Sequence, residues 1–353
     1  MQVIYVVKDE QGEITKDVHI EETSKDGLAE KIIYYYSSAK GISILDKYIS
    51  EKKYRKLYKQ AIAAYIAGNG LPALSHVHVG MKAGGIANWL QKENRVTYVV
   101  SEHWSGFLSE ADDKLEGQPF YLQSLWKKVM TGAGGITAVS DYLAKAIEKK
   151  YALPKVAVIP NVVDKTIFYP TPSTSNNIRF IHISGLEPLK NADAIIEAFA
   201  IVQKKYSEAR LDIVGPENAV LKALVTKLNA ENYIQFHNEV PQTQLAAYVR
   251  QSTALILFSS YETFGCVIIE ANACGIPVIV SDIPTFHETV TAGINGVFAK
   301  ANNVNDLAEK MIGVAAGIVS FNKETIAAGS EKYSYEKVGK QFSDWYTKLL
   351  SKH

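Results

Sequence analysis

Apolar and polar residues alternate in blocks between Ala254 and Asp282, and this stretch predicts the architecture of the chain around it. Two short apolar blocks flank a longer one, and small polar residues or glycine separate them: Ala254–Phe258, Ser259–Gly265, Cys266–Cys274, Gly275 and Ile276–Val280. The short blocks are typical of buried strands, and the longer one is typical of a helix that Gly275 ends. The stretch therefore predicts one parallel βαβ unit with a right-handed crossover.

The same alternation extends back through the second half of the chain. Strands are expected at 178–184, 210–215 and 233–236, and helices at 192–204, 219–228 and 242–251. Such a series predicts a doubly wound sheet. A last amphipathic helix is expected at 334–350, where apolar residues recur at helical spacing.

The first half begins with β structure and then becomes regularly α/β. Residues 1–38 predict strands at 3–7, 17–21 and 32–36, with a turn at 9–12. Further strands are expected at 76–79, 96–100, 136–140 and 155–160, and helices at 87–91, 119–130 and 141–150. Asp141 is expected to cap the last of these helices. The glycine-containing segment from Gly80 to Gly85 is expected to be a flexible loop that could admit a ligand.

A long helix is expected between these two regions, at 45–66. Its apolar side carries Leu45, Tyr48, Ile49, Ile62, Tyr65 and Ile66. Its other side carries Lys52, Lys53, Arg55, Lys56 and Lys59. The simplest interpretation of the basic side is a solvated face. The alternative is a contact with anionic lipid, to which Tyr54 and Tyr58 would add.

Composition narrows the class of protein. Hydrophobic residues make up 47% of the chain and charged residues 21%, as in ordinary globular proteins, and 353 residues suit two domains better than one. A formal net charge of +1 does not indicate a nucleic-acid partner. The two cysteines, Cys266 and Cys274, lie too far apart on one helix to form a disulfide, so a reducing cytoplasm is expected. Neither a signal peptide nor a run of about 18 apolar residues is present, so no membrane span is expected.

Two carboxylates within residues 254–282 do not fit a purely structural role. Glu262 is expected in a loop at the carboxyl end of a strand, where open α/β sheets bind ligands. Glu270 lies about two turns along a helix that otherwise looks buried. The first turn of that helix presents free N–H groups, and Gly265 lets an anion approach them. A bound diphosphate with a sugar near Glu262 and a ribose near Glu270 would explain the pattern. A solvated loop glutamate and a helix glutamate paired with a lysine would explain it equally.

Residues 260–279 resemble the donor site of retaining nucleotide-sugar glycosyltransferases of the GT-B fold, family four. The matching pattern is S-Y-E-T-F-G-x-x-x-x-E-A-x-A-x-G-x-P-V-I, in which Glu262 and Glu270 have the family's spacing. The resemblance implies that Glu262 holds the hydroxyls of the sugar and steadies developing positive charge, and that Glu270 holds the ribose. It further assigns the diphosphate to the helix start, at Phe264, Gly265 and Cys266.

Three further positions match the family. Lys190, after the strand at 178–184, matches one member of a basic pair that grips the diphosphate, whereas Gly185 stands where the family usually has arginine. Val240 lies where the family usually holds the nucleotide base. The segment E-H-W-S at 102–105 is similar to the family's first domain, which implies that His103 faces the donor sugar across the cleft. Without the resemblance, His103 would be interpreted as a structural histidine and Lys190 as a surface lysine.

The segment I-P-N-V-V-D at 159–164 resembles the family's P-N-G-V-D linker, and a Pro- and Ser-rich connector follows it. The expected organisation is therefore a Rossmann-like acceptor-side domain at 1–162, a Rossmann-like nucleotide-sugar domain at 163–332 and a helix at 333–353 that returns to the first domain. Together these form an α/β protein of the GT-B fold, with two doubly wound domains facing each other across a cleft. Residues 1–7 run into Lys8-Asp9-Glu10 rather than into a Gly-rich loop, so the first domain is expected to be short or incomplete at its start.

The predicted function is transfer of a hexose-type sugar, with retention, from a nucleotide-diphosphate sugar to an unknown acceptor in cell-surface polysaccharide or glycan synthesis. The expected partners are the nucleotide sugar and a carbohydrate or lipid-linked acceptor, with peripheral contact at the inner face of the membrane as an alternative to a purely cytoplasmic location. Neither a cofactor nor a metal is expected, because the sequence contains no D-x-D triplet and no His/Cys cluster with metal spacing. The alternatives are a catalytically impaired nucleotide-sugar-binding protein of the same fold and a nucleotide-sugar 2-epimerase.

Overall fold

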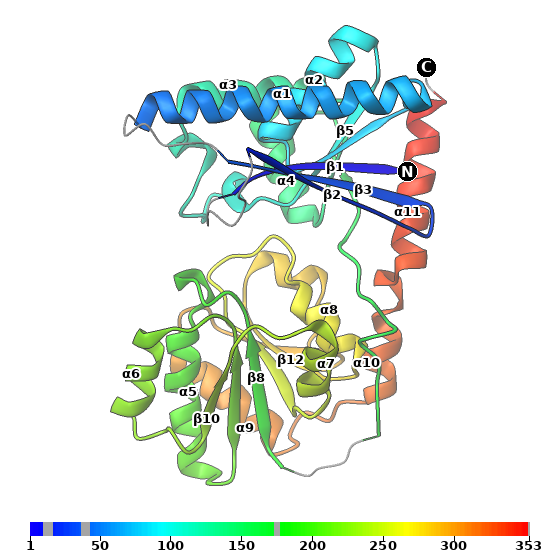
Figure 1. Cartoon of the computed structure of the whole chain (residues 1–353). Coiled ribbons are helices and arrows are strands. Elements are labelled where there is room, and N and C mark those ends of the chain that lie inside the picture. The colour runs from blue at the N-terminus through cyan, green and yellow to red at the C-terminus, as the bar shows by residue number, and fades with distance from the viewer. Residues whose placement is uncertain (10–16, 37–42, 173–176, 352–353) are drawn as a thin grey trace. The chain divides into compact units, whose positions relative to one another are not determined.

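The computed structural model describes residues 1–9, 17–36, 43–172 and 177–351 (Figure 1). The chain divides into two compact units. The first contains Met1–Val100 and Ser124–Gly134, and the second contains Ser101–Gln123 and Gly135–His353. The domain boundaries expected near residues 162 and 332 stay predictions.

The first unit begins with a small sheet of its own. Its strands are β1 (Gln2–Lys8), β2 (Val18–Lys25) and β3 (Leu28–Tyr35), in the order β1-β3-β2. β1 runs parallel to β3, and β2 runs antiparallel to it. The three strands expected at the start of the chain are thus confirmed, and the expected turn at 9–12 lies mostly outside the described residues. The opening strand belongs to this sheet and not to the sheet that contains β5.

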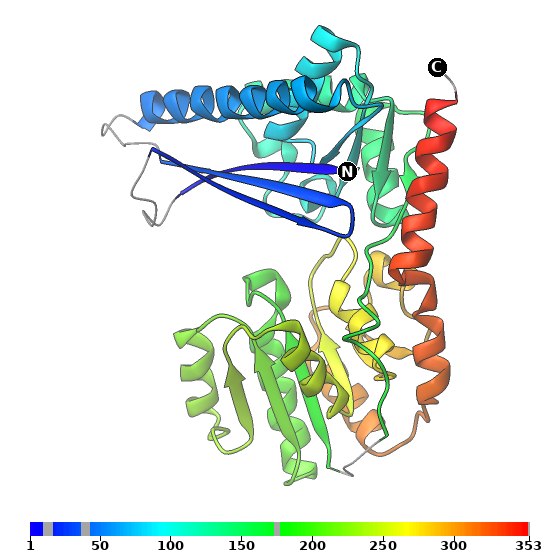
Figure 2. The ribbon, with the colours of Figure 1, turned by 45° about the vertical axis from the view of Figure 1, so that its right-hand side comes forward.

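Helix α1 (Ser43–Asn69) lies along this sheet (Figure 2). Its core-facing residues are Tyr54, Tyr58 and Ala61, which are buried together with residues of β1 and β3. The Tyr58 hydroxyl donates a hydrogen bond to the carbonyl of Ile4 at 3.4 Å. The apolar face expected for this helix is wrong at its start, where Leu45 and Tyr48 are exposed, whereas Ile62 packs against the buried cluster as expected. The spacing of residues 54, 58 and 61 places the rings of Tyr54 and Tyr58 on one face of the helix. The large apolar area of these two rings explains why this face is the buried one.

The basic side of α1 is also only partly solvated. Lys53 forms an ion pair with Asp17, and the Nζ atom of Lys59 lies 4.3 Å from the centre of the Trp89 ring. Because Tyr54 and Tyr58 are buried, they are not available for the lipid contact considered above. That contact stays a prediction. None of the helices in the described part of the chain is both long enough and apolar enough to span a bilayer.

A four-stranded sheet has the order β4-β5-β6-β7. Its elements, which confirm the predicted alternation, are β4 (Ser75–His78), α2 (Lys82–Asn94), β5 (Tyr98–Glu102), η1 (Ser105–Phe107), η2 (Leu115–Gly117), α3 (Phe120–Gly132), β6 (Gly135–Ala138), α4 (Asp141–Tyr151) and β7 (Ala157–Val158). Asp141 is not the cap of α4. Ser140 is, because its Oγ accepts a hydrogen bond from the amide of Leu143 at 3.2 Å.

The expected ligand-admitting loop at 80–85 is also wrong, because α2 begins at Lys82. Gly84 and Gly85 are helical, and they let α2 pack closely on α3. A Cβ atom on Gly84 would lie 2.5 Å from Cγ1 of Val129, and one on Gly85 would lie 3.3 Å from Cδ1 of Leu125. These glycines serve helix packing and not ligand access.

The second unit contains a six-stranded, wholly parallel sheet in the order β10-β9-β8-β11-β12-β13 (Figure 1). Its strands are β8 (Arg179–Ile183), β9 (Arg210–Val214), β10 (Ile234–His237), β11 (Ala254–Leu257), β12 (Val278–Ser281) and β13 (Gly296–Ala299). Its helices are α5 (Ala192–Lys205), α6 (Ala219–Lys227), α7 (Gln242–Arg250), α8 (Cys266–Ala273), α9 (Val304–Ala315) and α10 (Lys323–Gly329), with short helices η3 (Pro188–Lys190), η4 (Pro284–Glu288) and η5 (Glu331–Tyr333). α5 packs with α6 and α9, whereas α8 packs with α7 and α10, as expected of a doubly wound sheet.

The predicted βαβ unit at 254–282 is confirmed as β11, α8 and β12, with β11 parallel to β12. Gly275 adopts a left-handed φ of 74° directly after the helix, which is the conformation that a helix-ending glycine supplies. The last helix, α11 (Tyr335–Leu350), also forms as expected. It packs on the start of β6, where a Cβ atom on Gly135 would lie 2.8 Å from the ring of Trp345.

The packing of α2 on α3 leads to a prediction. Gly84→Ala should lower the free energy of unfolding by about 1–3 kcal/mol, because the added methyl group meets the stiff, buried Val129 side chain. Gly313→Ala is the matched control, since Gly313 lies in α9 with open space around it. That change should raise stability by roughly 0.5–1 kcal/mol through helix propensity. Urea unfolding of both variants checks this, and equal effects of the two changes would contradict the packing role of Gly84.

Candidate functional site

The candidate site lies where the order of the six-stranded sheet reverses. β8 is the first strand of the sheet in the chain, and it pairs with β9 on one side and with β11 on the other. Lys190 follows β8 and Glu262 follows β11. Because the two strands are parallel neighbours, both residues lie at the same edge of the sheet. Open α/β sheets bind ligands at such a reversal, outside the carboxyl ends of the strands.

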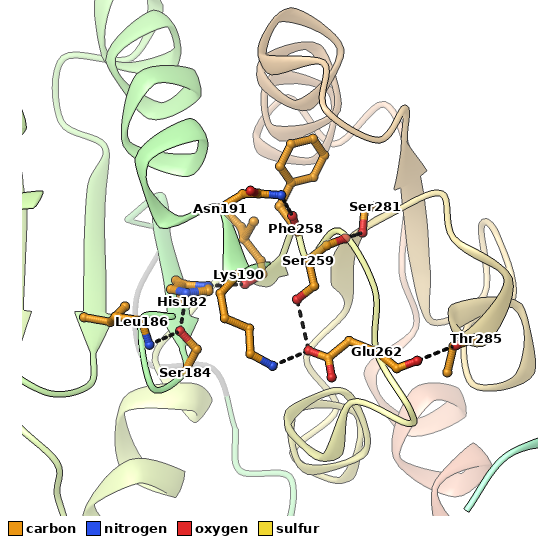
Figure 3. A network of polar contacts seen from close by, with 11 residues as sticks. His182, Ser184, Leu186, Lys190, Asn191, Phe258, Ser259, Glu262, Ser281 and Thr285 are labelled. Atoms are coloured by element: carbon orange, nitrogen blue, oxygen red, sulfur yellow. Dashed lines mark hydrogen bonds and ion pairs between the residues drawn. The ribbon is translucent and has the colours of Figure 1, made fainter. Parts of the chain in front are cut away.

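Hydrogen bonds join the two loops that leave the sheet at this point (Figure 3). The amide group of Asn191 donates to the carbonyl of Phe258 and to Oγ of Ser260, each at 3.0 Å. The backbone N–H of Ser260 donates to the carbonyl of Leu189 at 2.8 Å. Lys190 therefore stands between two residues that are tied to the end of β11.

Lys190 and Glu262 form an ion pair between Nζ and Oε1. The same carboxylate oxygen accepts a hydrogen bond from Oγ of Ser259 at 3.0 Å, and Oγ1 of Thr285 donates to the backbone carbonyl of Glu262 at 2.7 Å (Figure 3). The side chains of Lys190 and Glu262 are only 19% and 12% exposed. Glu262 is therefore not a solvated loop glutamate. Its carboxylate and the Lys190 ammonium group form a charged pair that is largely shielded from water.

A buried histidine supports the loop before Lys190. Nδ1 of His182 lies 2.9 Å from the carbonyl of Ile256, which can only accept, so Nδ1 carries the proton. Nε2 then accepts from Oγ of Ser184 at 2.8 Å, and that oxygen accepts from the amide of Leu186 at 3.0 Å. Burial lowers the pKa of His182 to about 4, so its ring is neutral near pH 7.

The start of α8 is open toward the same region. Gly265 is the N-cap residue with a φ of 84°, and no side chain caps the first turn. The first N–H groups of a helix have no partner within it, and they favour an anion. Phe264, just before the glycine, is buried and packs edge-on against Tyr333.

Cys266 is the first residue of α8. Its Sγ accepts a hydrogen bond from Nδ2 of Asn161 at 3.3 Å. Although part of the residue is exposed, burial of the thiol and the nearby Glu270 raise its pKa to about 11, so it stays protonated near pH 7. Neither Cys266 nor Cys274 forms a disulfide, as predicted.

Glu270 lies on the second turn of α8 and differs electrostatically from Glu262. Burial raises the pKa of its carboxyl to about 7. Among the ion pairs of the described residues, none involves Glu270. The carboxyl is thus half-protonated near neutral pH, and a hydroxyl-rich ligand could hydrogen-bond to it in either form.

The remaining predicted residues are placed as follows. Val240 lies between β10 and α7, and His103 directly follows β5. Their roles stay predictions. A Cβ atom on Gly185 would lie 2.3 Å from Oε1 of Glu187, and this position supplies no cationic side chain. Sequence reasoning missed Ser259 and Thr285, which hold Glu262. Ser259 could have been suspected, because a small polar residue that ends a buried strand faces the same edge as the loop glutamate.

Comparison with known proteins supports the fold and the family of this region. Residues 164–317 match the model of the family described as glycosyl transferases group 1. Sucrose-phosphate synthase from Thermosynechococcus elongatus aligns over 100% of this chain and 89% of its own, with a TM-score of 0.79 and 17% identity. Anabaena HepE, solved with UDP and glucose, aligns over 90% of this chain and 86% of its own, with a TM-score of 0.69 and 18% identity. The GT-B fold expected from the sequence is thus confirmed.

Among curated sequences, the O-antigen chain mannosyltransferase RfbU of Salmonella typhimurium is 30% identical over 50% of this chain and 50% of its own. This chain spans 64%, 54% and 49% of three other curated relatives. Because it matches only part of these proteins, their activities and substrates do not transfer to it directly. What the comparisons show is the GT-B fold and a match of residues 164–317 to glycosyl transferases group 1.

The raised pKa of Glu270 leads to a prediction about stability. A glutamate in an unfolded chain titrates near pH 4.3, so between about pH 4.5 and 7 the folded chain binds more protons at this position. This group therefore lowers the free energy of unfolding as the pH rises through that range. Glu270→Gln removes the titration. Its stability relative to wild type should be higher at pH 8 than at pH 5, by roughly 2–3 kcal/mol.

Urea unfolding of wild type and Glu270→Gln at both pH values measures this difference. Other titrating groups contribute equally to both proteins, so they cancel in the comparison. If the difference in stability is the same at pH 5 and pH 8, Glu270 titrates as an ordinary exposed carboxyl and the burial argument fails.

Proposed function

We propose that this chain, whose residues 164–317 belong to glycosyl transferases group 1, transfers a hexose-type sugar from a nucleotide-diphosphate sugar with retention at the anomeric carbon. The proposed acceptor is a carbohydrate or a lipid-linked carbohydrate in cell-surface polysaccharide or glycan synthesis. The observation that carries the proposal is the Lys190–Glu262 ion pair at the reversal between β8 and β11, next to the uncapped start of α8.

The first step is binding of the diphosphate. In the ligand-free chain Lys190 is held by Glu262, and an incoming diphosphate offers the lysine a more strongly charged partner. The N–H groups at the start of α8 add partial positive charge to the same place. These groups stabilise the leaving diphosphate most when its charge is greatest, which lowers the barrier to loss of the sugar.

The second step is positioning of the sugar. When Lys190 turns to the diphosphate, the Glu262 carboxylate becomes free to accept hydrogen bonds from sugar hydroxyls and to steady positive charge at the anomeric carbon. Ser259 and Thr285 keep it in place during this exchange of partners. In the same scheme Glu270 holds the ribose, Val240 lies beside the base, and His103 completes the sugar site.

Two of the compared proteins support the substrate class. Anabaena HepE was solved with UDP and glucose, which are the two parts of a nucleotide sugar. RfbU is named as an O-antigen chain mannosyltransferase, so its name refers to transfer of a sugar onto a glycan chain.

The direct test is a binding and turnover screen of the full chain. Thermal shift against UDP-, GDP- and ADP-sugars should single out one donor class, since a ligand at about 100 times its Kd stabilises by roughly 2.7 kcal/mol. The best donor is then incubated with a glycan acceptor panel, and the products are separated. A glycoside of retained configuration supports the proposal. An epimerised donor would identify a 2-epimerase, binding without any product would identify a binding protein, and no binding at all would refute the donor site.

If Lys190 leaves Glu262 to bind the diphosphate, the variant Glu262→Gln should have two effects. Turnover should fall by about 100-fold or more, because the negative charge that stabilises the transition state is lost. Affinity for the bare nucleoside diphosphate should rise, because the diphosphate no longer competes with the Glu262 carboxylate for Lys190. Titration calorimetry and initial rates measure the two effects.

Lys190→Met is the complementary variant, and it should weaken binding of the bare nucleoside diphosphate. Opposite changes in affinity for the two variants would place the diphosphate on Lys190. If Glu262→Gln loses affinity for the diphosphate to the same extent as Lys190→Met, the ion pair is itself the binding site and the proposed exchange is wrong.

A further prediction concerns the ribose. At pH 8, where the Glu270 carboxyl is mostly charged, Glu270→Ala should weaken binding of the bare nucleoside diphosphate by about 10- to 100-fold, because hydrogen bonds to a charged group are worth roughly 1.5–3 kcal/mol. A deoxyribose analogue should bind wild type less tightly than the ribose compound does, whereas the variant should no longer distinguish the two. A variant that still prefers ribose would move the ribose contact to another residue.

A further inference from the structure

A carboxylate far along the chain holds the start of α4. Glu288, the last residue of η4, accepts a hydrogen bond from the amide of Asp141 at 2.7 Å and another from the amide of Tyr142 at 2.8 Å, one on each carboxylate oxygen. Helix N-termini favour negative charge, so this arrangement is electrostatically complementary. α4 already has its own cap in Ser140, which bonds the amide of Leu143. Glu288 therefore adds a long-range connection to a helix that the sequence caps locally.

The same short helix holds the candidate catalytic loop. Thr285, three residues before Glu288, is 1% exposed, and its Oγ1 donates to the backbone carbonyl of Glu262 at 2.7 Å. Phe286 between them is fully buried. The buried middle of η4 thus holds the Glu262 backbone and its exposed last residue holds the start of α4, so the positions of these two segments are linked through η4.

A second connection lies on the other side of Glu262. The hydroxyl of Tyr261 accepts a hydrogen bond from the amide of Asp112 at 3.2 Å. Tyr261 directly precedes Glu262, and Asp112 lies in the segment between η1 and η2. The backbone of the Glu262 loop is thus connected on one side to Asp112 and on the other, through Thr285 and Glu288, to the start of α4.

We propose that Glu288 is a positioning residue that acts through Thr285 to keep Glu262 in place relative to α4. The expected effect of Glu288 on turnover rests on the proposed function. Its expected effect on the position of the Glu262 loop does not. Glu288 touches neither the reacting groups nor Lys190. Because it lies at the surface, its hydrogen bonds contribute little to overall stability, and its loss changes placement more than folding.

The test compares Glu288→Gln with Glu309→Gln, a control at an exposed glutamate of α9 that the site does not contain. The glutamine keeps the size of the side chain, but its NH₂ group faces one of the two α4 amides and cannot accept from it. We expect faster hydrogen exchange in peptides covering 140–146 and 259–265, and a kcat lowered by about ten-fold or more, since small misplacement of a catalytic group has effects of this size. Affinity for the bare nucleoside diphosphate and the Tm should stay as in the control.

Thr285→Val supplies the second variant, because it removes only the hydroxyl that bonds the Glu262 carbonyl. It should produce the same faster exchange at 259–265 and the same loss of kcat. If Glu288 acts through Thr285, the double variant should be no worse than the more impaired single variant. Effects on kcat that multiply would show two independent roles and overturn the inference.

The outcomes separate this inference from the proposed function. If wild type binds no nucleotide and forms no product, the proposed function fails, and hydrogen exchange at 259–265 alone decides the positioning role. If wild type is active but Glu288→Gln changes exchange only at 140–146 and leaves kcat unchanged, Glu288 is a helix cap and the inference is overturned. A fall in Tm with uniformly faster exchange would also overturn it, since that indicates a general loss of stability.

Discussion

The candidate site depends on one constraint, which is that the loops after β8 and β11 must stay side by side. The two strands are parallel neighbours, yet their helices, α5 and α8, pack with different sets of helices. The loops therefore diverge as they leave the sheet and would separate without cross-links. The hydrogen bonds from Asn191 to Phe258 and Ser260, and from Ser260 to Leu189, supply those links. As a result a lysine and a glutamate that lie 72 residues apart in the chain meet at a largely buried position.

Removing an unpaired charge from water costs free energy, and two buried glutamates near this position offset that cost in different ways. Glu262 is compensated by Lys190 and by a hydroxyl, because removing two charges from water requires close pairing and hydrogen bonding. Glu270 is compensated by protonation, since burial favours its neutral form. In the proposed function, a diphosphate takes the lysine from the first arrangement and a ribose bonds to the second, so the two glutamates serve different parts of one ligand.

Around these groups lies a layer of small polar residues whose partners are mostly backbone atoms. His182 and Ser184 support the loop before Lys190, and Thr285 supports Glu262. A neutral buried histidine with a defined tautomer is a rigid support, because both ring nitrogens already have partners. Such a layer restricts the motion of the charged side chains, and catalytic groups need that restriction. In the inference drawn above, Glu288 extends the same layer to the start of α4.

Short-range regularities in the amino-acid sequence were sufficient to determine the βαβ unit at 254–282, the helix stop at Gly275, the alternating elements of both α/β regions and the resemblance to GT-B glycosyltransferases. These depend on periodicity, turn chemistry and motif spacing, which act between residues close in the chain. Only the tertiary structure decided that Tyr54 and Tyr58 form the buried face of α1, that Gly84 serves helix packing, and that the partner of Glu262 is Lys190. Each of these depends on which distant surface meets the residue. An apolar residue, a glycine or a lysine carries no local mark of its partner, because that partner is chosen by packing and by the desolvation of charge when the whole chain folds.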